Sequence, residues 1–363
     1  MSTLAPRSAT LPQAVPDWKT DAVTLVLPTA EMYAYNRDLA ALELLYADLC
    51  RELARYDSVE CLVPDAAHAE KMARLSGIGP EHFPLGTIPD IWIRDFAPIP
   101  VTGGLVRFRY APRYTRREIN AQIESAVRRH FGRCGQPVSA EDVALEGGNL
   151  VHNGAGVGIA TERLFSSNRG TPRAEVVERI RRALGLERLI LIPPEPGDRT
   201  GHSDGMLRFA NERLLLVNDY TGASGNGRFL QRLERVLDRK LPDVERIRLP
   251  YPVSSEKRDG WYDARGNYVN FLLTGRRIYA PAYGLAEDAA ALEVFERLFP
   301  GRVSCVDASP VARYGGSINC ITWNHVRGDG AHGPIGRPPR RPRPRAQSRP
   351  GARRGRPGPS PPL

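Results

Sequence analysis

The regular alternation of short apolar runs with helical patterns is the feature that most limits what this chain can fold into. Residues 23–27 form a β-branched and leucine-rich run, and leucines then recur at helical spacing from Leu39 to Leu53. The same alternation predicts helices over 116–131, 172–184, 228–237 and 287–298, and strands over 189–192, 214–217 and 303–306. The chain is therefore predicted to be of the α/β class, although alternation alone does not separate a doubly wound sheet, a barrel and a propeller.

The length of 363 residues suits one large domain or two smaller ones. The first twenty residues lack the basic start and apolar block of a secretory signal. No later stretch approaches the roughly 20 consecutive apolar residues of a membrane span. We therefore expect a cytoplasmic protein without a membrane partner, while the sequence leaves open whether it forms a homo-oligomer.

The cysteines do not form a recognisable framework. There are five, an odd number, they are widely spaced, and no two form a CxxC pair; they are Cys50, Cys61, Cys134, Cys305 and Cys320. This pattern argues against both a disulfide scaffold and a zinc knuckle. Each cysteine must be judged singly.

Charge separates a body from a tail. The segment 327–363 contains ten arginines and one aspartate, a charge of +9, which leaves only +1 of the total +10 for residues 1–326. A nearly neutral body gives no electrostatic reason to expect nucleic-acid binding. The tail is rich in Arg, Pro and Gly and is expected to be disordered, because it cannot bury enough apolar surface to offset the entropy of ordering it. It is either an arm for RNA or another anionic partner or a dispensable extension.

The glycine-rich segment 153–160, NGAGVGIA, invites comparison with a dinucleotide-binding loop. Such a loop follows a strand, opens a helix and has its third glycine three residues after the second. Here the glycines alternate at 154, 156 and 158, and Val157 and Ile159 continue like a strand. The segment therefore predicts a β-hairpin.

Four other segments place titratable residues beside glycine or directly after apolar, strand-like residues, as functional groups on tight loops often are. Their sequences are WIRD at 92–95, EGGN at 146–149, GHSDG at 201–205 and GGSINC at 315–320. Each has an ordinary structural explanation when taken alone. A lone cysteine is often a small buried hydrophobe, a histidine beside glycine is often a turn residue, and an aspartate after arginine is often half of an ion pair.

Together these segments resemble the agmatine deiminase and bacterial peptidylarginine deiminase family, a branch of the guanidine-modifying enzymes. The blocks WIRDFAPIP, LEGGN, TGHSDGMLRF, YVNF, FPGRV and GGSINCITW occur in the family's order across most of residues 90–325. The resemblance implies a five-bladed, pseudo-symmetric α/β propeller of ββαβ units (pentein-like) in a single deiminase catalytic domain, 1–326, followed by the disordered tail, 327–363. It also implies that five residues meet on the central axis: Asp95, Glu146, His202, Asp204 and Cys320.

The chain departs from the established agmatine deiminases at three places. It has His202-Ser203-Asp204 where they tend to have HVD, Phe96 where they have a small polar residue, and Ser317-Ile318-Asn319-Cys320 where they have an Asn-Ile-His-Cys run. The charged and nucleophilic positions survive all three changes. The departures therefore concern the far end of the substrate.

The chemistry explains why the family needs these residue types. A guanidinium is a planar cation, so two carboxylates can hold its N–H fork; we assign Asp95 and Asp204 to this role. Cys320 attacks the guanidinium carbon, and His202, with a reference pKa of about 6.5, protonates the departing ammonia and later activates water. By the family pattern, Glu146 hydrogen-bonds His202. No metal and no organic cofactor is required.

Two further residues are predicted to contact substrate. They are Trp92, which could stack on it, and Asn149, which follows Glu146 in the EGGN block. Both predictions rest on neighbourhood in the sequence and not on a chemical requirement.

Four functions remain open from the sequence. The first is deimination of agmatine to N-carbamoylputrescine and ammonia, for putrescine biosynthesis, and the second is deimination of peptidyl-arginine to citrulline; free arginine is a further substrate option. The third is amidino transfer to an amine. The fourth is a catalytically inactive propeller that binds an anionic partner, such as RNA, through the tail.

Overall fold

Five three-stranded sheets of one connectivity make up most of the described chain. The computed structural model describes residues 12–221, 227–252, 254 and 256–327; the predicted disordered tail beyond Arg327 lies outside this range. In each sheet an antiparallel strand pair is combined with a third strand that runs parallel to the central one. The fold is therefore mixed α/β, as the alternation predicts.

Four of these ββαβ units are continuous in the chain. The first contains β3 (Ile99–Val101), β4 (Gly104–Arg109), α4 (Arg117–Phe131) and β5 (Val138–Ala144). The second contains β6 (Val151–His152), β7 (Val157–Thr161), α5 (Arg173–Leu184) and β8 (Arg188–Ile192). The third contains β9 (Leu207–Asn211), β10 (Leu214–Asn218), α6 (Gly227–Lys240) and β11 (Glu245–Leu249). The fourth contains β14 (Leu272–Leu273), β15 (Ile278–Ala282), α7 (Asp288–Leu298) and β16 (Val303–Asp307).

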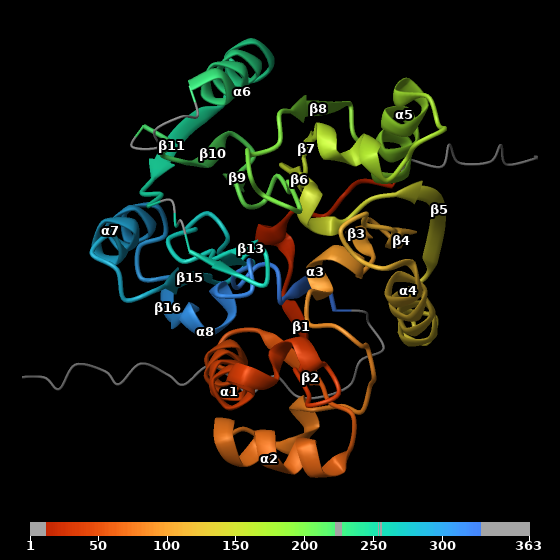
Figure 1. Cartoon of the computed structure of the whole chain (residues 1–363), viewed down its shortest axis with the longest axis vertical. Coiled ribbons are helices and arrows are strands. Elements are labelled where there is room, and N and C mark those ends of the chain that lie inside the picture. The colour runs from red at the N-terminus through yellow and green to blue at the C-terminus, as the bar shows by residue number, and fades with distance from the viewer. Residues whose placement is uncertain (1–11, 222–226, 253, 255, 328–363) are drawn as a thin grey trace, which may run out of the picture.

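The fifth unit joins the two ends of the described chain. Its parallel strands are β1 (Ala22–Val26) and β2 (Ser58–Leu62), with α1 (Leu39–Ala54) between them. Its outer strand is β17 (Trp323–His325), which pairs antiparallel with β1. Figure 1 shows the five units around a common centre, with α1 and α4 to α7 toward the periphery.

Shorter elements connect the units. The α-helices are α2 (Ala66–Ser76), α3 (Ile93–Phe96) and α8 (Ser309–Ala312), and a hairpin is formed by β12 (Lys257–Arg258) and β13 (Trp261–Tyr262). The 3₁₀ turns are η1 (Asp17–Lys19), η2 (Tyr33–Asp38), η3 (Pro80–His82), η4 (Gly147–Asn149) and η5 (Glu162–Ser166).

The prediction of a hairpin over 153–160 is confirmed. Strands β6 and β7 pair antiparallel, with Val151 opposite Ile159. The chain turns through Gly154 and Gly156, whose φ angles of +63° and +83° favour glycine. Strand β7 is then followed by the turn η5, so the segment does not have the strand-to-helix geometry of a dinucleotide loop.

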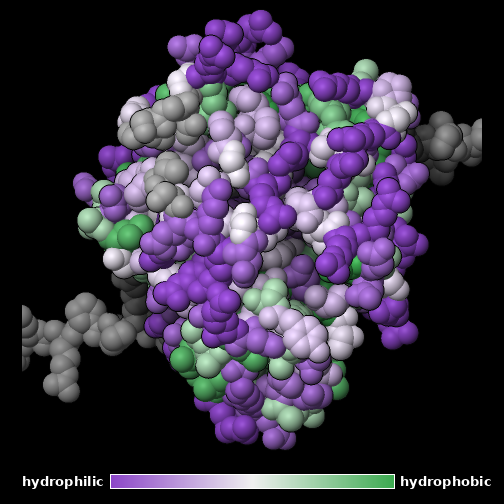
Figure 2. All heavy atoms as spheres, viewed as in Figure 1, coloured by the Kyte–Doolittle hydropathy of each residue, from purple (hydrophilic) through white to green (hydrophobic). Residues whose placement is uncertain are grey.

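Helix α1 buries the leucines that repeat at helical spacing and exposes its opposite face. Leu42 and Leu49 are fully buried, whereas Leu44 on the opposite face is 54% exposed. Figure 2 shows a face covered mainly by hydrophilic side chains, with apolar residues in small groups. None of the helices in the described part of the chain combines the length and the apolar composition that a membrane span needs.

Candidate active site

The loops that carry the predicted site residues are tied together near the centre of the molecule. Asp95 lies in α3, Glu146 directly precedes η4, His202 and Asp204 lie between β8 and β9, and Cys320 precedes β17. Backbone hydrogen bonds connect the loops: the N–H of Arg94 donates to the carbonyl of Cys320 at 3.2 Å, and the N–H of Asp204 donates to Gly148 at 3.1 Å. Segments up to 225 positions apart in the chain thus form one site.

His202 is held between two carboxylates. Its Nε2 lies 2.8 Å from Oε2 of Glu146, and its Nδ1 lies 3.5 Å from Oδ1 of Asp95. All three side chains are buried or nearly so. The expected hydrogen bond between Glu146 and His202 is confirmed. Each ring nitrogen faces a carboxylate oxygen, and both nitrogens can donate a hydrogen bond only when the ring carries both protons.

Gly148 makes this arrangement sterically feasible. Its N–H donates to Oδ1 of Asp95 at 3.0 Å. A Cβ at this position would lie 2.6 Å from Oδ1 of Asp95 and 2.6 Å from Nδ1 of His202. The EGGN block therefore needs glycine here because the carboxylate and the imidazole both approach the backbone directly.

Cys320 and Asp204 are linked through two asparagines. The thiol of Cys320 donates to Oδ1 of Asn270 at 3.3 Å. Nδ2 of Asn270 donates to the backbone carbonyl of Asp204, and Nδ2 of Asn319 donates to Oδ2 of Asp204 at 2.7 Å. Cys320 and Asp204 are thus fixed relative to each other, and Cys320 remains partly accessible.

The site's charges determine its protonation. Burial would lower the pKa of His202, but Asp95 and the hydrogen-bonded Glu146 raise it to about 10. Burial raises the pKa of Asp95 to about 7, although the neighbouring His202 opposes this. Burial, followed by the charges of Asp204 and Asp95, raises the pKa of Cys320 well above its ordinary value. Without ligand at neutral pH, we therefore expect an imidazolium and a thiol.

A surplus of negative charge favours a cationic ligand at this site. Three carboxylates, those of Asp95, Glu146 and Asp204, face the single imidazole of His202. The nearby cation Arg94 is already engaged: its Nε donates to the carbonyl of Asn319, its guanidinium also donates to Oδ1 of Asn324, and Asp17 is the carboxylate that acts on it most strongly. A planar guanidinium would find both charge and hydrogen-bond acceptors here.

Aromatic residues border the loop of Cys320. A Cβ at Gly316 would lie 2.4 Å from the ring of Trp92 and 3.2 Å from Cβ of Cys320, so Trp92 is next to the loop of Cys320. A Cβ at Gly315 would lie 3.4 Å from the ring of Trp261. Substrate stacking by Trp92 stays a prediction, but the residue is in the right neighbourhood.

Asn149 has a structural task. Its side chain is 3% exposed, and its Oδ1 accepts a hydrogen bond from the N–H of Thr161 at 2.9 Å. This bond anchors the turn η4 on strand β7. Direct contact of Asn149 with substrate therefore remains a prediction that this bond does not support.

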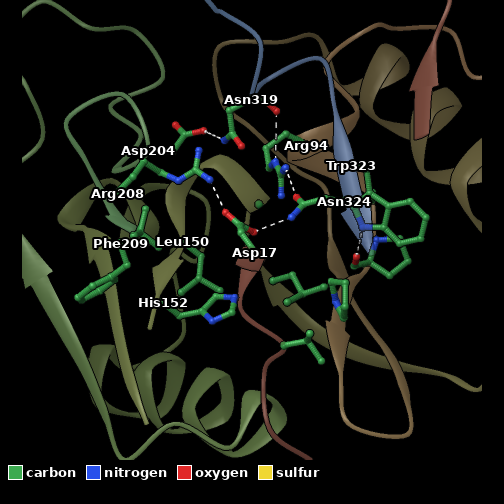
Figure 3. A pocket seen from close by; sticks show the side chains of 17 residues that line it. Asp17, Arg94, Leu150, His152, Asp204, Arg208, Phe209, Asn319, Trp323 and Asn324 are labelled. Carbon is green, nitrogen blue, oxygen red and sulfur yellow. Dashed lines mark hydrogen bonds and ion pairs between the residues drawn. The ribbon is translucent and has the colours of Figure 1, made fainter. Parts of the chain in front are cut away.

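A polar cavity lies behind the site. Figure 3 shows Asp204 and Arg208 on one side of it and Arg94 and Asn324 on the other, with Asp17 between Arg208 and Asn324. Asp17 accepts hydrogen bonds from Arg208 and from Nδ2 of Asn324. The N-terminal segment therefore forms part of the lining of the cavity that Asp204 also borders.

Four residues of this site escaped the prediction. Asn270 lies in the YVNF block, which indicated the family without giving the asparagine a task, and Asn319 entered only as a departure from the family pattern. Tyr114, which donates to Oε2 of Glu146 at 2.7 Å, and Trp261 lie outside every block. Only the folded contacts reveal these two.

Metal ligation has no candidate among the described residues, because no three His, Cys, Asp or Glu side chains are grouped to hold an ion. The expectation that the chemistry needs neither metal nor organic cofactor stays a prediction.

Known proteins are similar to this chain over most of its length. A family model described as Porphyromonas-type peptidyl-arginine deiminase matches residues 14–325. The agmatine deiminase of Pseudomonas aeruginosa (strain LESB58) is 26% identical over 321 residues, which cover 76% of this chain and 85% of the relative. That of Pseudomonas fluorescens (strain Pf-5) is 27% identical over 320 residues, with the same two shares covered.

A solved structure shares the fold. The agmatine deiminase of C. jejuni superposes with a TM-score of 0.77 at 19% identity, over 90% of this chain and 99% of that one. Fold, site and relatives together define a hydrolase that acts on guanidino C–N bonds. Within that class, the chain belongs to the Porphyromonas-type peptidyl-arginine deiminase family, which includes its agmatine deiminase relatives.

Proposed function

We propose that this protein hydrolyses a guanidinium substrate to a ureido product and ammonia, with agmatine as the first candidate substrate and N-carbamoylputrescine as its product. One observation carries the proposal: an imidazole held by two carboxylates stands in the same cluster as a cysteine and a third carboxylate. The choice of agmatine is supported by the names of the relatives. Such a reaction would serve putrescine biosynthesis.

In the first half-reaction, Asp95 and Asp204 hold the guanidinium, and its positive charge lowers the pKa of the Cys320 thiol, which loses its proton to solvent. The thiolate forms a C–S bond to the guanidinium carbon. His202 donates a proton to the leaving nitrogen as the C–N bond breaks, which releases ammonia and leaves a thiouronium on Cys320.

In the second half-reaction, the now neutral His202 removes a proton from water. The hydroxide attacks the thiouronium carbon, and the C–S bond of the resulting adduct breaks. The departing sulfur of Cys320 takes up the hydroxyl proton of the adduct, which releases the neutral ureido product and restores the thiol next to the protonated His202. The cationic thiouronium next to His202 favours the neutral imidazole, because like charges disfavour each other. Glu146 orients the ring in both steps.

The overall architecture belongs to the same proposal. The five ββαβ units and the closure of β17 on β1 support a five-bladed, pseudo-symmetric propeller. We assign residues 1–326 to a single catalytic domain on this basis. The function of the basic tail, 327–363, and with it the alternative of an inactive propeller that binds an anionic partner, concerns residues outside the described range.

A second candidate substrate is arginine, free or in a peptide. Arg199 favours free arginine: its exposed guanidinium lies 4.4 Å over the ring of Trp261, which borders the loop of Cys320. Among the described residues its side chain has no ion-pair partner. An α-carboxylate would be attracted by this cation, whereas the ammonium of agmatine would be repelled.

The test is ammonia release from agmatine, free L-arginine and an arginine-containing peptide. We compare the parent, Cys320→Ala and, as a matched control, Cys305→Ala, which changes an exposed cysteine on β16. We expect turnover of one substrate, abolished only in Cys320→Ala. No turnover of any substrate, together with a Cys320 that does not react with a haloacetamidine, would contradict the proposal.

A further inference from the structure

Tyr114 contacts the acid–base pair directly. It lies in the loop between β4 and α4, and its hydroxyl donates to Oε2 of Glu146 at 2.7 Å. The same oxygen faces Nε2 of His202 at 2.8 Å. Two donors therefore share one carboxylate oxygen, and each reduces the negative charge that the other experiences.

The ring of Tyr114 is fixed by a second aromatic residue. It meets Trp261 edge to face, with centroids 5.5 Å apart and an interplanar angle of 88°. Trp261 is in turn bordered by Gly315, five residues before Cys320, and by the guanidinium of Arg199. This contact holds the hydroxyl toward Glu146, so the hydrogen bond does not depend on a freely rotating side chain.

The hydroxyl can act only as a donor to Glu146. Burial, and then the charge of Glu146, raise the pKa of Tyr114 well above its ordinary value, so the phenol keeps its proton. The carboxylate accepts from Tyr114 on one side and from the imidazolium on the other.

We propose that Tyr114 is a positioning residue of the deimination reaction, whose hydroxyl sets how strongly Glu146 stabilises the protonated ring of His202. The inference rests on the proposed function and adds to it a residue that does not touch the reacting atoms. By neutralising part of the Glu146 charge, Tyr114 makes the imidazolium a better proton donor in the first half-reaction. It also makes the neutral imidazole easier to form in the second.

Other ionisable groups also influence the protonation of the Glu146–His202 pair. Asp95 and Asp204 act on His202 alongside Glu146, and Tyr110 lies within the field of Glu146. Replacing Tyr114 by phenylalanine leaves all of these in place and keeps the ring that meets Trp261. The substitution therefore removes only the hydroxyl, with its bond to Glu146 and its interaction with the hydroxyl of Tyr110.

The experiment compares the pH dependence of kcat in the parent, Tyr114→Phe and Tyr33→Phe, which makes the same change at a tyrosine that is 85% exposed. Without the Tyr114 hydroxyl, Glu146 holds the His202 proton more strongly. We expect every limb of the profile that His202 governs to move to higher pH by about one unit, the size expected from losing a hydrogen bond to a charged group. Tyr33→Phe should leave the profile unchanged.

A lower kcat with an unmoved profile would overturn the proposal, because it would assign Tyr114 a merely structural role. A second measurement does not require turnover: the His202 ring is titrated by NMR in the full-length Cys320→Ala protein, with and without Tyr114→Phe. We expect a higher pKa with the substitution, and no such difference when Glu146→Gln is also present. An equal difference in the Glu146→Gln background would show that Tyr114 does not act through Glu146, and this arm stays decisive if the parent deiminates none of the substrates.

Discussion

The contacts around Gly148 show how one backbone position controls the geometry of two side chains of the candidate site, Asp95 and His202. Its amide holds Asp95, and its missing side chain leaves room for the ring of His202. Small displacements of such groups have large effects on rate, because the reacting atoms must be aligned closely in the transition state.

We therefore expect Gly148→Ala to reduce kcat by about 100-fold or more, the cost of a displacement of roughly 1 Å. The new Cβ would lie 2.6 Å from both Asp95 and His202, and one of them must move. Steady-state kinetics with circular dichroism would separate misalignment from unfolding. Gly227→Ala is the control, since a Cβ there meets nothing within 4 Å; wild-type kcat in Gly148→Ala would refute the steric explanation.

Residues with a direct part in the proposed chemistry could be predicted from the sequence more readily than the residues that hold them in place. Cys320, His202 and Glu146 have properties that the proposed reaction requires, and their motifs drew attention to them. Asn270 and Tyr114 act through contacts with those residues across 50 and 32 positions of sequence. Such contacts leave no periodicity or spacing that could be detected in one sequence.

Elements were predictable where one side of a helix or strand is buried. The patterns over 116–131 and 287–298 correspond to α4 and α7 within a residue or two, because their apolar faces repeat at helical spacing. The pattern over 228–237 predicted a helix shorter than α6, because the last turn of α6 ends in the charged residues Arg239 and Lys240 and adds no apolar position to the repeat. The hairpin β12–β13 has only two residues in each strand, too few for an alternating pattern.

Helix α1 offers a test of the same rule. Leu42 is fully buried and Leu44 is 54% exposed, two positions away on the same helix. We expect Leu42→Ala to lower the free energy of unfolding by about 2–5 kcal/mol, the usual cost of a large-to-small change in a core. Leu44→Ala should change it by less than about 0.5 kcal/mol. Urea denaturation of both variants measures this, and equal effects would contradict the assigned face of α1.

The whole molecule depends on a closure that no local pattern predicts. Strand β17 pairs with β1 across about 300 positions of the chain, with Val23 opposite Asn324. Before β1, the N-terminal segment crosses two other units: the N–H of Ala14 donates to Leu184, and that of Val15 donates to Pro100. In the sequence, the resemblance to a known family implied a closed arrangement; periodicity did not.

Asp17 is where this closure connects with the site. It accepts from Arg208 on β9 and from Asn324 on β17, and Oδ1 of Asn324 accepts from Arg94 (Figure 3). Arg94 then donates to the carbonyl of Asn319 beside the nucleophile. Two of the units, the N-terminal segment, helix α3 and the Cys320 loop therefore share one buried polar network.

Asp17→Asn should weaken this network by about 3 kcal/mol, because it leaves the guanidinium of Arg208, whose side chain is 4% exposed, without its counter-charge. The new amide also turns an N–H toward one of the two donors that Asp17 now accepts from. As a control, Glu162→Gln removes a pair with Arg232 in which both side chains are more than a third exposed, and it should cost less than about 1 kcal/mol. A lower urea midpoint with an unchanged m-value in Asp17→Asn alone would support the network as a determinant of global stability. Equal midpoints for both variants would mean that the closure is held by β17–β1 pairing and apolar packing, with the buried charges contributing nothing measurable.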